Sequence, residues 1–229
     1  MSTEDLIVRL RADVARGATQ RELAPVIDAL ASELEARRAL EARVRASHAA
    51  MMRLARSPSV GEGRLDDALR EITECASQVL RCARSSVWIY DADHTAIRCI
   101  DLYLADSGAH EVGIVLPAKT YPAYFRALRE DRTIAARDAH TDPRTSEFSA
   151  GYLAPLGIGA MLDAPIHVGG RMIGVLCNEH VGAARAWSAD EEQFAGSIAD
   201  FVALAMESQK RREIEDQLRA MVAALEDER

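Results

Sequence analysis

The stretch GVLCNEH, residues 174–180, places a thiol, a carboxylate and an imidazole within four positions, at Cys177, Glu179 and His180. Such groups are candidates for a metal or a catalytic site. The same stretch also fits the end of a buried β-strand. Successive side chains of a regular strand point to opposite faces, so Cys177 and His180 would point apart and share no metal. We therefore interpret the stretch as sheet, with Cys177 as a buried thiol that fills space like an apolar side chain.

The strand assignment depends on a hairpin signal. AMLDAPIHV and RMIGVLCNEH are two extended runs joined by Gly169 and Gly170, a pair that favours a two-residue β-turn. A regular ladder counted outward from that turn pairs Leu162 with Cys177 on an apolar face. The opposite face is then predicted to carry Met161, Asp163 and Asn178.

Other short runs predict the elements around this hairpin. SSVWIYD, AIRCIDLYL, EVGIVLP and RTIAARDA have the composition of strands. Residues 65–79 and the run TYPAYFRALRED fit amphipathic helices, and SEFSAGYLAPLG fits a helix closed by a glycine. The sequence therefore predicts one mixed domain of strands and helices.

Long helices are predicted at both ends of the chain. Residues 3–16 fit a short helix that stops at Gly17. Thr19 to Glu22 has the form of a capping box, but a proline is unfavourable inside a helix, so we expect the long helix to run from Pro25 to about Arg56. A second capping box, Ser188 to Glu191, opens the last helix, whose second half carries an apolar stripe at 4-3 spacing. The stripe consists of Ile214, Leu218, Met221 and Leu225.

Composition excludes several functional classes. The chain has 229 residues and a net charge of -8, and its basic residues are interspersed with acids, so we expect no nucleic-acid partner. The apolar runs are all shorter than the roughly 20 residues that a bilayer needs, and the charged N-terminus lacks a signal core, which predicts a cytoplasmic protein without membrane insertion. The four cysteines and six histidines are scattered, so we expect no metal.

The order of these elements, with the stretches DAHTDPRTSEF, YLAPLGIGAMLDAPI, IGVLCNEH and AWSADEEQFAGSIAD, resembles the GAF domain family. The resemblance implies an α+β fold with a central antiparallel β-sheet and helices on both faces, flanked here by long N- and C-terminal coiled-coil helices. We expect an N-terminal helical segment at 1–57, the GAF domain at 58–207 and a C-terminal linker helix at 208–229. The resemblance also implies a small-molecule pocket under loops on one face of the sheet. The candidate pocket residues are Tyr121, Tyr124, Phe125, Asp138, Phe148, Tyr152, Met161, Asp163 and Asn178.

Two departures bear on the ligand that the resemblance implies. Members that bind cyclic nucleotides carry an Asn-Lys pair where this chain has Asn178 and Glu179, and bilin-binding members often carry a Cys-His dipeptide, which this chain lacks. A single axial histidine, His110 or His140, is an alternative that would hold a haem. The aromatic candidates fit ordinary core packing as well as a ligand site. We therefore expect no known cofactor and leave the ligand unidentified.

The function expected from these observations is that of a regulatory sensor in signal transduction, and not of an enzyme. The flanking helices, too long for one small domain to cover, predict a homodimer. The resemblance to the GAF family implies a neighbouring output domain such as a histidine kinase or a diguanylate cyclase. Two alternatives stay open. One is an enzyme like the GAF-fold reductases of free methionine sulfoxide, and the other is a dimerisation scaffold without a ligand.

Overall fold

A computed structural model describes residues 3–227, and their contacts divide the chain into one unit that ends at His48 and another that begins at Ala49. The first unit holds helix α1 (Thr3–Ala15) and most of helix α2 (Gln20–Ala55). Leu6 and Val26 are its buried apolar side chains among the described residues. No helix in residues 3–227 combines the length and the apolar character needed to cross a membrane.

Helix α2 begins earlier than the sequence predicted. The backbone N–H and the hydroxyl of Thr19 both donate to a carboxylate oxygen of Glu22, each over 2.7 Å, so the helix starts at Gln20 and Pro25 lies inside it. A proline at this position removes one backbone hydrogen bond near the start of the helix. The expected start at Pro25 was therefore wrong, because the local cap outweighs the cost of the proline.

The second unit is built on an antiparallel sheet of seven strands within residues 3–227. The order is β3-β2-β1-β7-β6-β5, and β4 also pairs with β2. The bounds are β1 Arg84–Tyr90, β2 Ala96–Leu104, β3 Ala109–Glu111, β4 Val115–Pro117, β5 Ile134–Ala136, β6 Ile158–Val168 and β7 Arg171–Val181. The run EVGIVLP, expected as one strand, contributes to both β3 and β4, which Gly113 separates with φ +96°.

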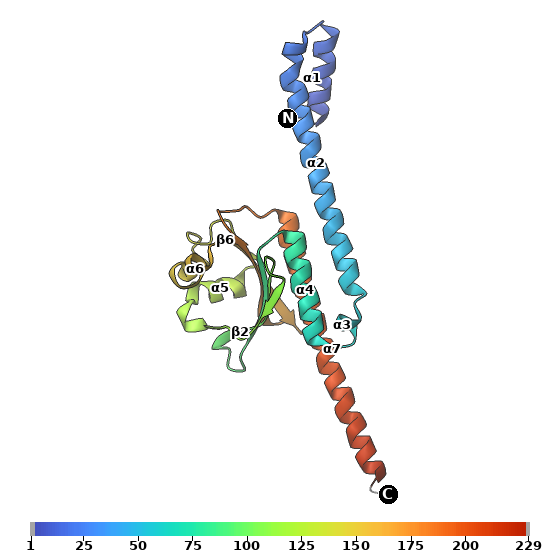
Figure 1. Ribbon diagram of the computed structural model, residues 1–229, viewed down its shortest axis with the longest axis vertical. Helices are drawn as coiled ribbons and strands as arrows, with labels where there is room; N and C mark the ends of the chain where they lie inside the picture. The colour runs from blue at the N-terminus through green and yellow to red at the C-terminus, as the bar shows by residue number, and fades with distance from the viewer. Residues whose placement is uncertain (1–2, 228–229) are drawn as a thin grey trace. The chain divides into compact units, whose positions relative to one another are not determined.

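One face of the sheet is covered by helices α4 (Leu65–Leu80) and α7 (Ala189–Asp227), which lie side by side in Figure 1. The short helix α3 (Pro58–Gly61) and the end of α2 complete this layer. Ile72 of α4 and Ile198 of α7 are fully buried against strand residues such as Leu176. We call this the helix face of the sheet.

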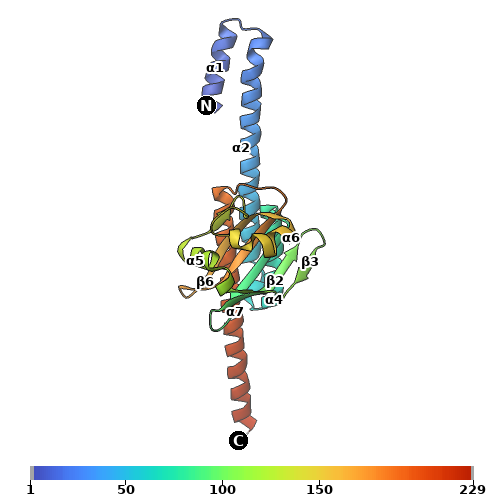
Figure 2. The same cartoon turned by 90° about the vertical axis from the view of Figure 1, so that its left-hand side faces the viewer.

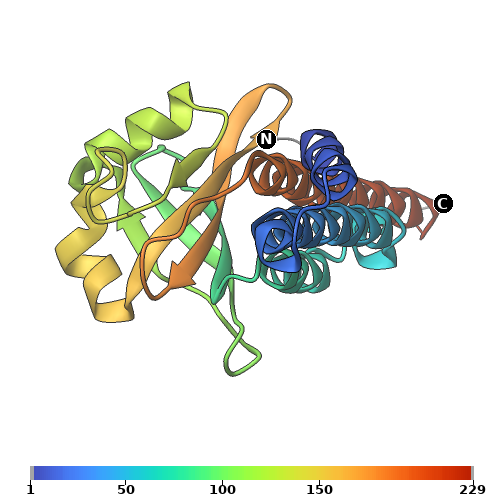
Figure 3. The same cartoon turned by 90° about the horizontal axis from the view of Figure 1, so that it is seen from above.

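The other face is covered by helix α5 (Pro122–Glu130) and a series of short turns, which we call the roof (Figure 2). The roof comprises the 3₁₀ turns η1 (Ala118–Thr120) and η2 (Ser146–Phe148), the π-helical turn η3 (Ser149–Leu153) and helix α6 (Ala154–Leu156). The expected helix over SEFSAGYLAPLG is therefore present as three consecutive turns of different pitch, and Gly157 closes it with φ +66°. Figure 3 shows the sheet between the roof and the helix layer.

The β6–β7 hairpin forms as predicted at its turn but differs in register beyond it. Val168 pairs with Arg171 across the two glycines, but an extra residue of β7, Ile173, forms a bulge between the pairs His167–Met172 and Ile166–Gly174. A bulge shifts every later pair by one position. Cys177 therefore lies opposite Asp163, and the predicted pairing with Leu162 was wrong.

Helix α7 has two different halves. The predicted capping box forms at its start, where Ser188 and Glu191 exchange backbone-to-side-chain hydrogen bonds of 2.8 and 3.3 Å. Residues from Phe194 to Ser208 contribute buried side chains, whereas residues 211–226 are all exposed. The first half of α7 therefore packs on the sheet, and the second half extends beyond it.

Candidate functional site

The space between the roof and the sheet is filled by the protein's own side chains. The remaining cavity is about 10 Å³ in volume, enough for about one water molecule. Its walls are mainly aromatic and apolar, with one acid and one thiol. The lining residues are Trp88, Ile97, Leu116, Tyr124, Phe148, Tyr152, Met161, Cys177 and Glu179. In this conformation the roof is closed, and a drug-sized ligand would have to displace it.

Ring contacts hold the roof closed. Phe148 of η2 is the centre of the cluster: Tyr121 stacks on it with centroids 4.1 Å apart, and Tyr124 meets it edge-on at 4.8 Å. Phe125 packs edge-on against Tyr124 at 5.6 Å, and Tyr152 lies 6.1 Å from Phe148. Such pairs contribute beyond the apolar area that they bury. The predicted pocket aromatics are thus together, with Tyr121 and Phe125 outside the cavity lining.

An acid, a phenol and a thiol meet on the roof face of the β6–β7 hairpin. The Tyr124 hydroxyl donates to Oδ2 of Asp163 over 2.7 Å and lies 3.5 Å from the Cys177 sulfur. Complete burial raises the pKa of Asp163 to about 8, so this carboxyl holds its proton at neutral pH. Burial likewise raises the pKa of Cys177 well above its usual value. The thiol is therefore a poor nucleophile.

A buried ion pair lies next to this group. Nε of Arg84 donates to Oε2 of Glu179 over 2.7 Å, and the two side chains are 12% and 2% exposed. Burial raises the pKa of Glu179, and the arginine opposes that shift. Burial raises the pKa of the Tyr152 hydroxyl, and the nearby ion pair also influences that pKa. The Tyr152 hydroxyl nevertheless makes no hydrogen bond of good geometry in residues 3–227.

Two buried oxygens near the cavity have no hydrogen-bond partner in residues 3–227, namely Oδ1 of Asp163 and the Tyr152 hydroxyl. An unsatisfied buried polar atom costs roughly 1 to 3 kcal/mol, so each of these oxygens favours binding of a polar guest or a water. The site offers hydrogen-bond donors and acceptors and one ion pair. It can therefore recognise a polar group but lacks an activated nucleophile.

The remaining predicted site residues lie elsewhere. Asn178 points to the helix face, where it accepts from the Ser85 hydroxyl over 2.9 Å and donates to the Leu162 carbonyl over 3.1 Å. Its assignment to the pocket was wrong, because the bulge at Ile173 exchanges the two faces of β7 beyond it. Asp138 accepts from the backbone N–H of His140 in a surface turn.

Met161 and Asp163 do lie on the roof side, as predicted for the pocket. The sequence patterns did not indicate Arg84, Trp88 or the place of Glu179 in the site. Arg84 and Trp88 share one face of a strand at i, i+4 spacing, which is a usable signal. Their pairing with β7, 95 residues away for Arg84 and Glu179, is not visible in either run alone.

The histidines do not form a metal site. His110 contacts Asp101 over 2.9 Å and Glu74 over 3.3 Å, and Thr73 binds the same aspartate from α4 on the helix face, away from the roof. His140 contacts the Ser149 hydroxyl over 2.7 Å. Within residues 3–227, no group of three or more histidine, cysteine or acidic side chains is arranged to hold a metal ion.

The fold and its relatives agree with the predicted family. The sequence model of the GAF domain matches residues 64–206, which is more than half of the chain. No curated protein matches the chain. Among solved structures, the phytochrome photosensory core module of Stigmatella aurantiaca is similar over 80% of this chain and 40% of that one, at 15% identity and a TM-score of 0.61. This chain therefore spans less than half of that module.

Two solved GAF domains are matched over nearly their whole length. The blue-light absorbing form of the PixJ GAF domain of Thermosynechococcus elongatus is similar over 70% of this chain and 94% of that one, at 16% identity and a TM-score of 0.57. The GAF domain of a phosphoenolpyruvate-protein phosphotransferase from Coxiella burnetii is similar over 75% of this chain and 96% of that one, at 14% identity and a TM-score of 0.56. At such identities the likeness establishes the fold alone.

Proposed function

Because the chain belongs to the GAF domain family, a family with sensory and regulatory members, we propose that it is the sensor module of a cytoplasmic signal-transduction protein. In this proposal two copies pair in parallel through their flanking helices. A small polar molecule or group bound under the roof shifts the packing of those helices. The shift regulates an output domain, for which a histidine kinase or a diguanylate cyclase is suitable.

The observation that carries the proposal is the exposed apolar stripe on the second half of α7. Ile214, Leu218, Met221 and Leu225 are 48%, 56%, 64% and 65% exposed and follow 4-3-4 spacing. That spacing is typical of a two-stranded coiled coil. Because the same helix packs on the sheet in its first half, a change in the domain would reach the stripe through one continuous helix.

Light scattering on the full chain tests the dimer. We expect a dimer for the unmodified protein and a monomer for the double variant Leu218→Glu/Leu225→Glu, because charges at core positions of a coiled coil repel and lose apolar contact. Gln217→Glu is the matched control, since it adds a charge to the same exposed helix beside the stripe. A monomer at tens of micromolar for the unmodified chain would refute the proposed transmission.

The roof supports a ligand of limited size. The cavity holds about one water, but two unsatisfied oxygens line or adjoin it, and the π-helical turn η3 carries Tyr152 over it. A π-helical turn is rare and often lies at a functional site. We therefore expect that ligand entry requires η3 to move. Native mass spectrometry of freshly purified protein would detect a bound molecule.

The filled cavity also favours the second candidate, a dimerisation scaffold without a ligand. A dimer without any bound mass, whose roof resists added small molecules, would select it. An enzyme of the sulfoxide-reductase kind has less support. The thiols are buried, and burial raises the pKa of Cys82 and of Cys99 to about 12. Thiol-dependent turnover of free methionine sulfoxide would nevertheless establish that alternative.

A further inference from the structure

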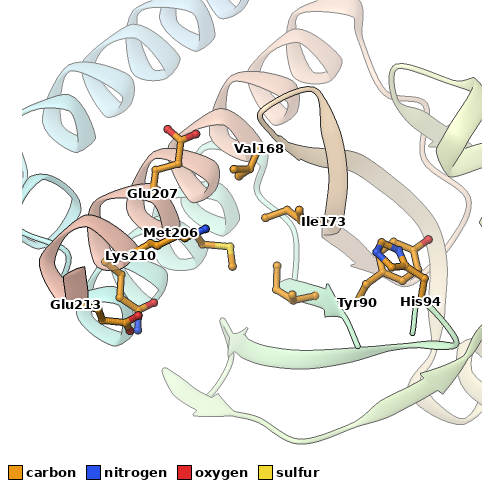
Figure 4. A pocket seen from close by; sticks show the side chains of 10 residues that line it. Tyr90, His94, Val168, Ile173, Met206, Glu207, Lys210 and Glu213 are labelled. Atoms are coloured by element: carbon orange, nitrogen blue, oxygen red, sulfur yellow. The ribbon is translucent and has the colours of Figure 1, made fainter. Parts of the chain in front are cut away.

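A second and larger hollow lies on the helix side of the sheet, where α7 leaves it (Figure 4). Its volume is about 450 Å³, within the range of small-molecule sites and far above the 10 Å³ left under the roof. Its floor is apolar and consists of Ile89, Val168, Ile173 and Met206. Each of these side chains is only partly buried by the fold. We call this hollow the α7 cleft.

Local backbone features build the floor of the α7 cleft. Ile173 is the bulged residue of β7 and lies on the helix face, as Ile166 and Val168 of β6 do. Next to it, a Cβ on Gly174 would lie 2.1 Å from the Trp88 carbonyl oxygen, so only glycine allows β1 and β7 to approach this closely. Ile89 and Ile173 are thereby placed together beneath α7.

The two ends of the α7 cleft are polar and differ in character. At one end the ring of His94 stacks on Tyr90 with centroids 4.7 Å apart, and His94 adopts φ +55°, which is uncommon outside glycine. Asp91 fixes that loop by accepting from the backbone and the hydroxyl of Thr95, each over 2.7 Å. At the other end Lys210 and Glu213 of α7 supply a donor and an acceptor.

Three of the residues that line the α7 cleft lie on a different side of α7 from the stripe, whereas Glu207, which also lines it, lies seven residues before Ile214 and continues the stripe. At about 100° per residue, the positions of Met206, Lys210 and Glu213 lie on one side of α7, and the centre of the stripe from Ile214 to Leu225 lies roughly 80° further around the axis. A helix partner centred on the stripe therefore faces a different side of α7 from Met206, Lys210 and Glu213.

We propose that the α7 cleft is a regulatory binding site for a largely apolar small molecule with a neutral or zwitterionic polar end. The apolar body lies on Ile89, Ile173 and Met206, and its polar end meets both charge signs at Lys210 and Glu213. Because α7 forms one wall at the level where it leaves the sheet, occupancy biases the direction of the exposed half. That regulatory consequence rests on the proposed transmission through α7, whereas the binding does not.

The test is a fluorescence titration of the full chain with N-phenyl-1-naphthylamine, a neutral, flat and apolar probe. We expect saturation at one probe per chain. Met206→Glu and Ile173→Gln should each weaken binding by roughly tenfold, which corresponds to about 1.4 kcal/mol. Leu218→Glu, on the stripe, should leave the affinity unchanged. Circular dichroism of each variant checks the fold, and the two variants lie on different elements, so the failure of one to fold leaves the other informative.

Three results would overturn the proposal. The first is an unchanged probe affinity in folded Met206→Glu and Ile173→Gln. The second is a loss of probe binding in Leu218→Glu, which would place the probe on the stripe. The third is a probe affinity that falls as the protein concentration rises, which would make a second copy of the chain the occupant of the cleft. Light scattering is measured separately. A monomer that binds the probe at the cleft therefore refutes the dimer and supports the site.

Discussion

The two faces of the same sheet are built on different physical principles. The helix face is covered by α4 and α7 through aliphatic side chains such as Ile72 and Ile198, and its Ser85–Asn178 pair is neutral and hydrogen-bonded. The roof face carries aromatic rings, a protonated acid, a thiol and an ion pair within one closed interior. Apolar packing is insensitive to pH, whereas buried ionisable groups are not.

This difference assigns separate roles to the two faces. A close-packed aliphatic layer transmits displacement, since it resists compression and its helices continue beyond the domain. The roof face keeps unsatisfied oxygens at a free-energy cost that a polar guest would relieve. The comparison predicts that perturbations of the Asp163 and Arg84–Glu179 groups on the roof face depend on charge and pH, and that those of the neutral Ser85–Asn178 pair on the helix face do not.

The largest expected effect is on the buried ion pair of the roof face. Arg84→Met removes the cation and leaves the Glu179 carboxylate buried without it, which should lower the free energy of unfolding by roughly 3 to 5 kcal/mol. Urea denaturation measures this change. The double variant Arg84→Met/Glu179→Met is the control and should recover much of the loss. If the single variant costs as little as the double one, the pair has no special energetic role.

The next effect is a pH dependence from Asp163. Its folded pKa of about 8 lies above the value of an unfolded aspartate, near 4, so the folded state binds the extra proton between these two values. The contribution of Asp163 to the free energy of unfolding is therefore fully present below pH 4. It is lost as the pH rises towards 8, by at most about 1.4 kcal/mol per pH unit. Comparing urea midpoints of the unmodified protein and Asp163→Asn from pH 5 to pH 8 isolates this slope. A variant with the same slope as the unmodified protein would exclude Asp163 as its source.

A smaller effect is expected from the neutral pair on the helix face. Ser85→Ala removes the donor to Asn178, whose side chain still donates to the Leu162 carbonyl. We expect a loss of about 1 kcal/mol, equal at pH 5 and pH 8 because neither partner titrates. Thermal unfolding at both values provides the measurement. A loss that changes with pH would contradict the contrast between the two faces.

The smallest effect is expected at Cys177. The sequence alone predicts a cost of about 1 to 2 kcal/mol for Cys177→Ser, from a hydroxyl buried beside Leu162. The observed neighbours are Asp163 and the Tyr124 hydroxyl, which can satisfy a serine, so we now expect a cost below about 1 kcal/mol. Cys177→Val, which offers no hydrogen bond, is the comparison and should cost more. Equal losses would show that the thiol acts only as an apolar filler.

Local signals predicted the elements that local interactions control. The turn at Gly169–Gly170, the capping box from Ser188 to Glu191 and the amphipathic helix α4 depend on residues within a few positions of one another, and all three are present. The predicted start of α2 at Pro25 was wrong, although the capping and proline signals that set it are also local. There the cost of Pro25 and the gain from the Thr19 cap compete, and residue types do not give their relative size.

The site was predicted only in part, because one extra residue decides which face a strand residue occupies. Tyr124, Phe148, Tyr152 and Met161 were expected under the roof and line the cavity there. Asn178 was misplaced because a bulge has no distinctive sequence pattern and reverses the alternation beyond it. The roof face is therefore predictable in composition but not in register.

The amino-acid sequence by itself determined the GAF fold, its flanking helices and the exposed stripe on α7, because hydrophobic period and turn residues are local properties. Tertiary structure alone decided that Arg84 meets Glu179, that the roof closes to about 10 Å³ and that the α7 cleft stays open. Those outcomes depend on the distances between side chains far apart in the chain. Such distances follow from how whole elements pack, and no single run of residues contains them.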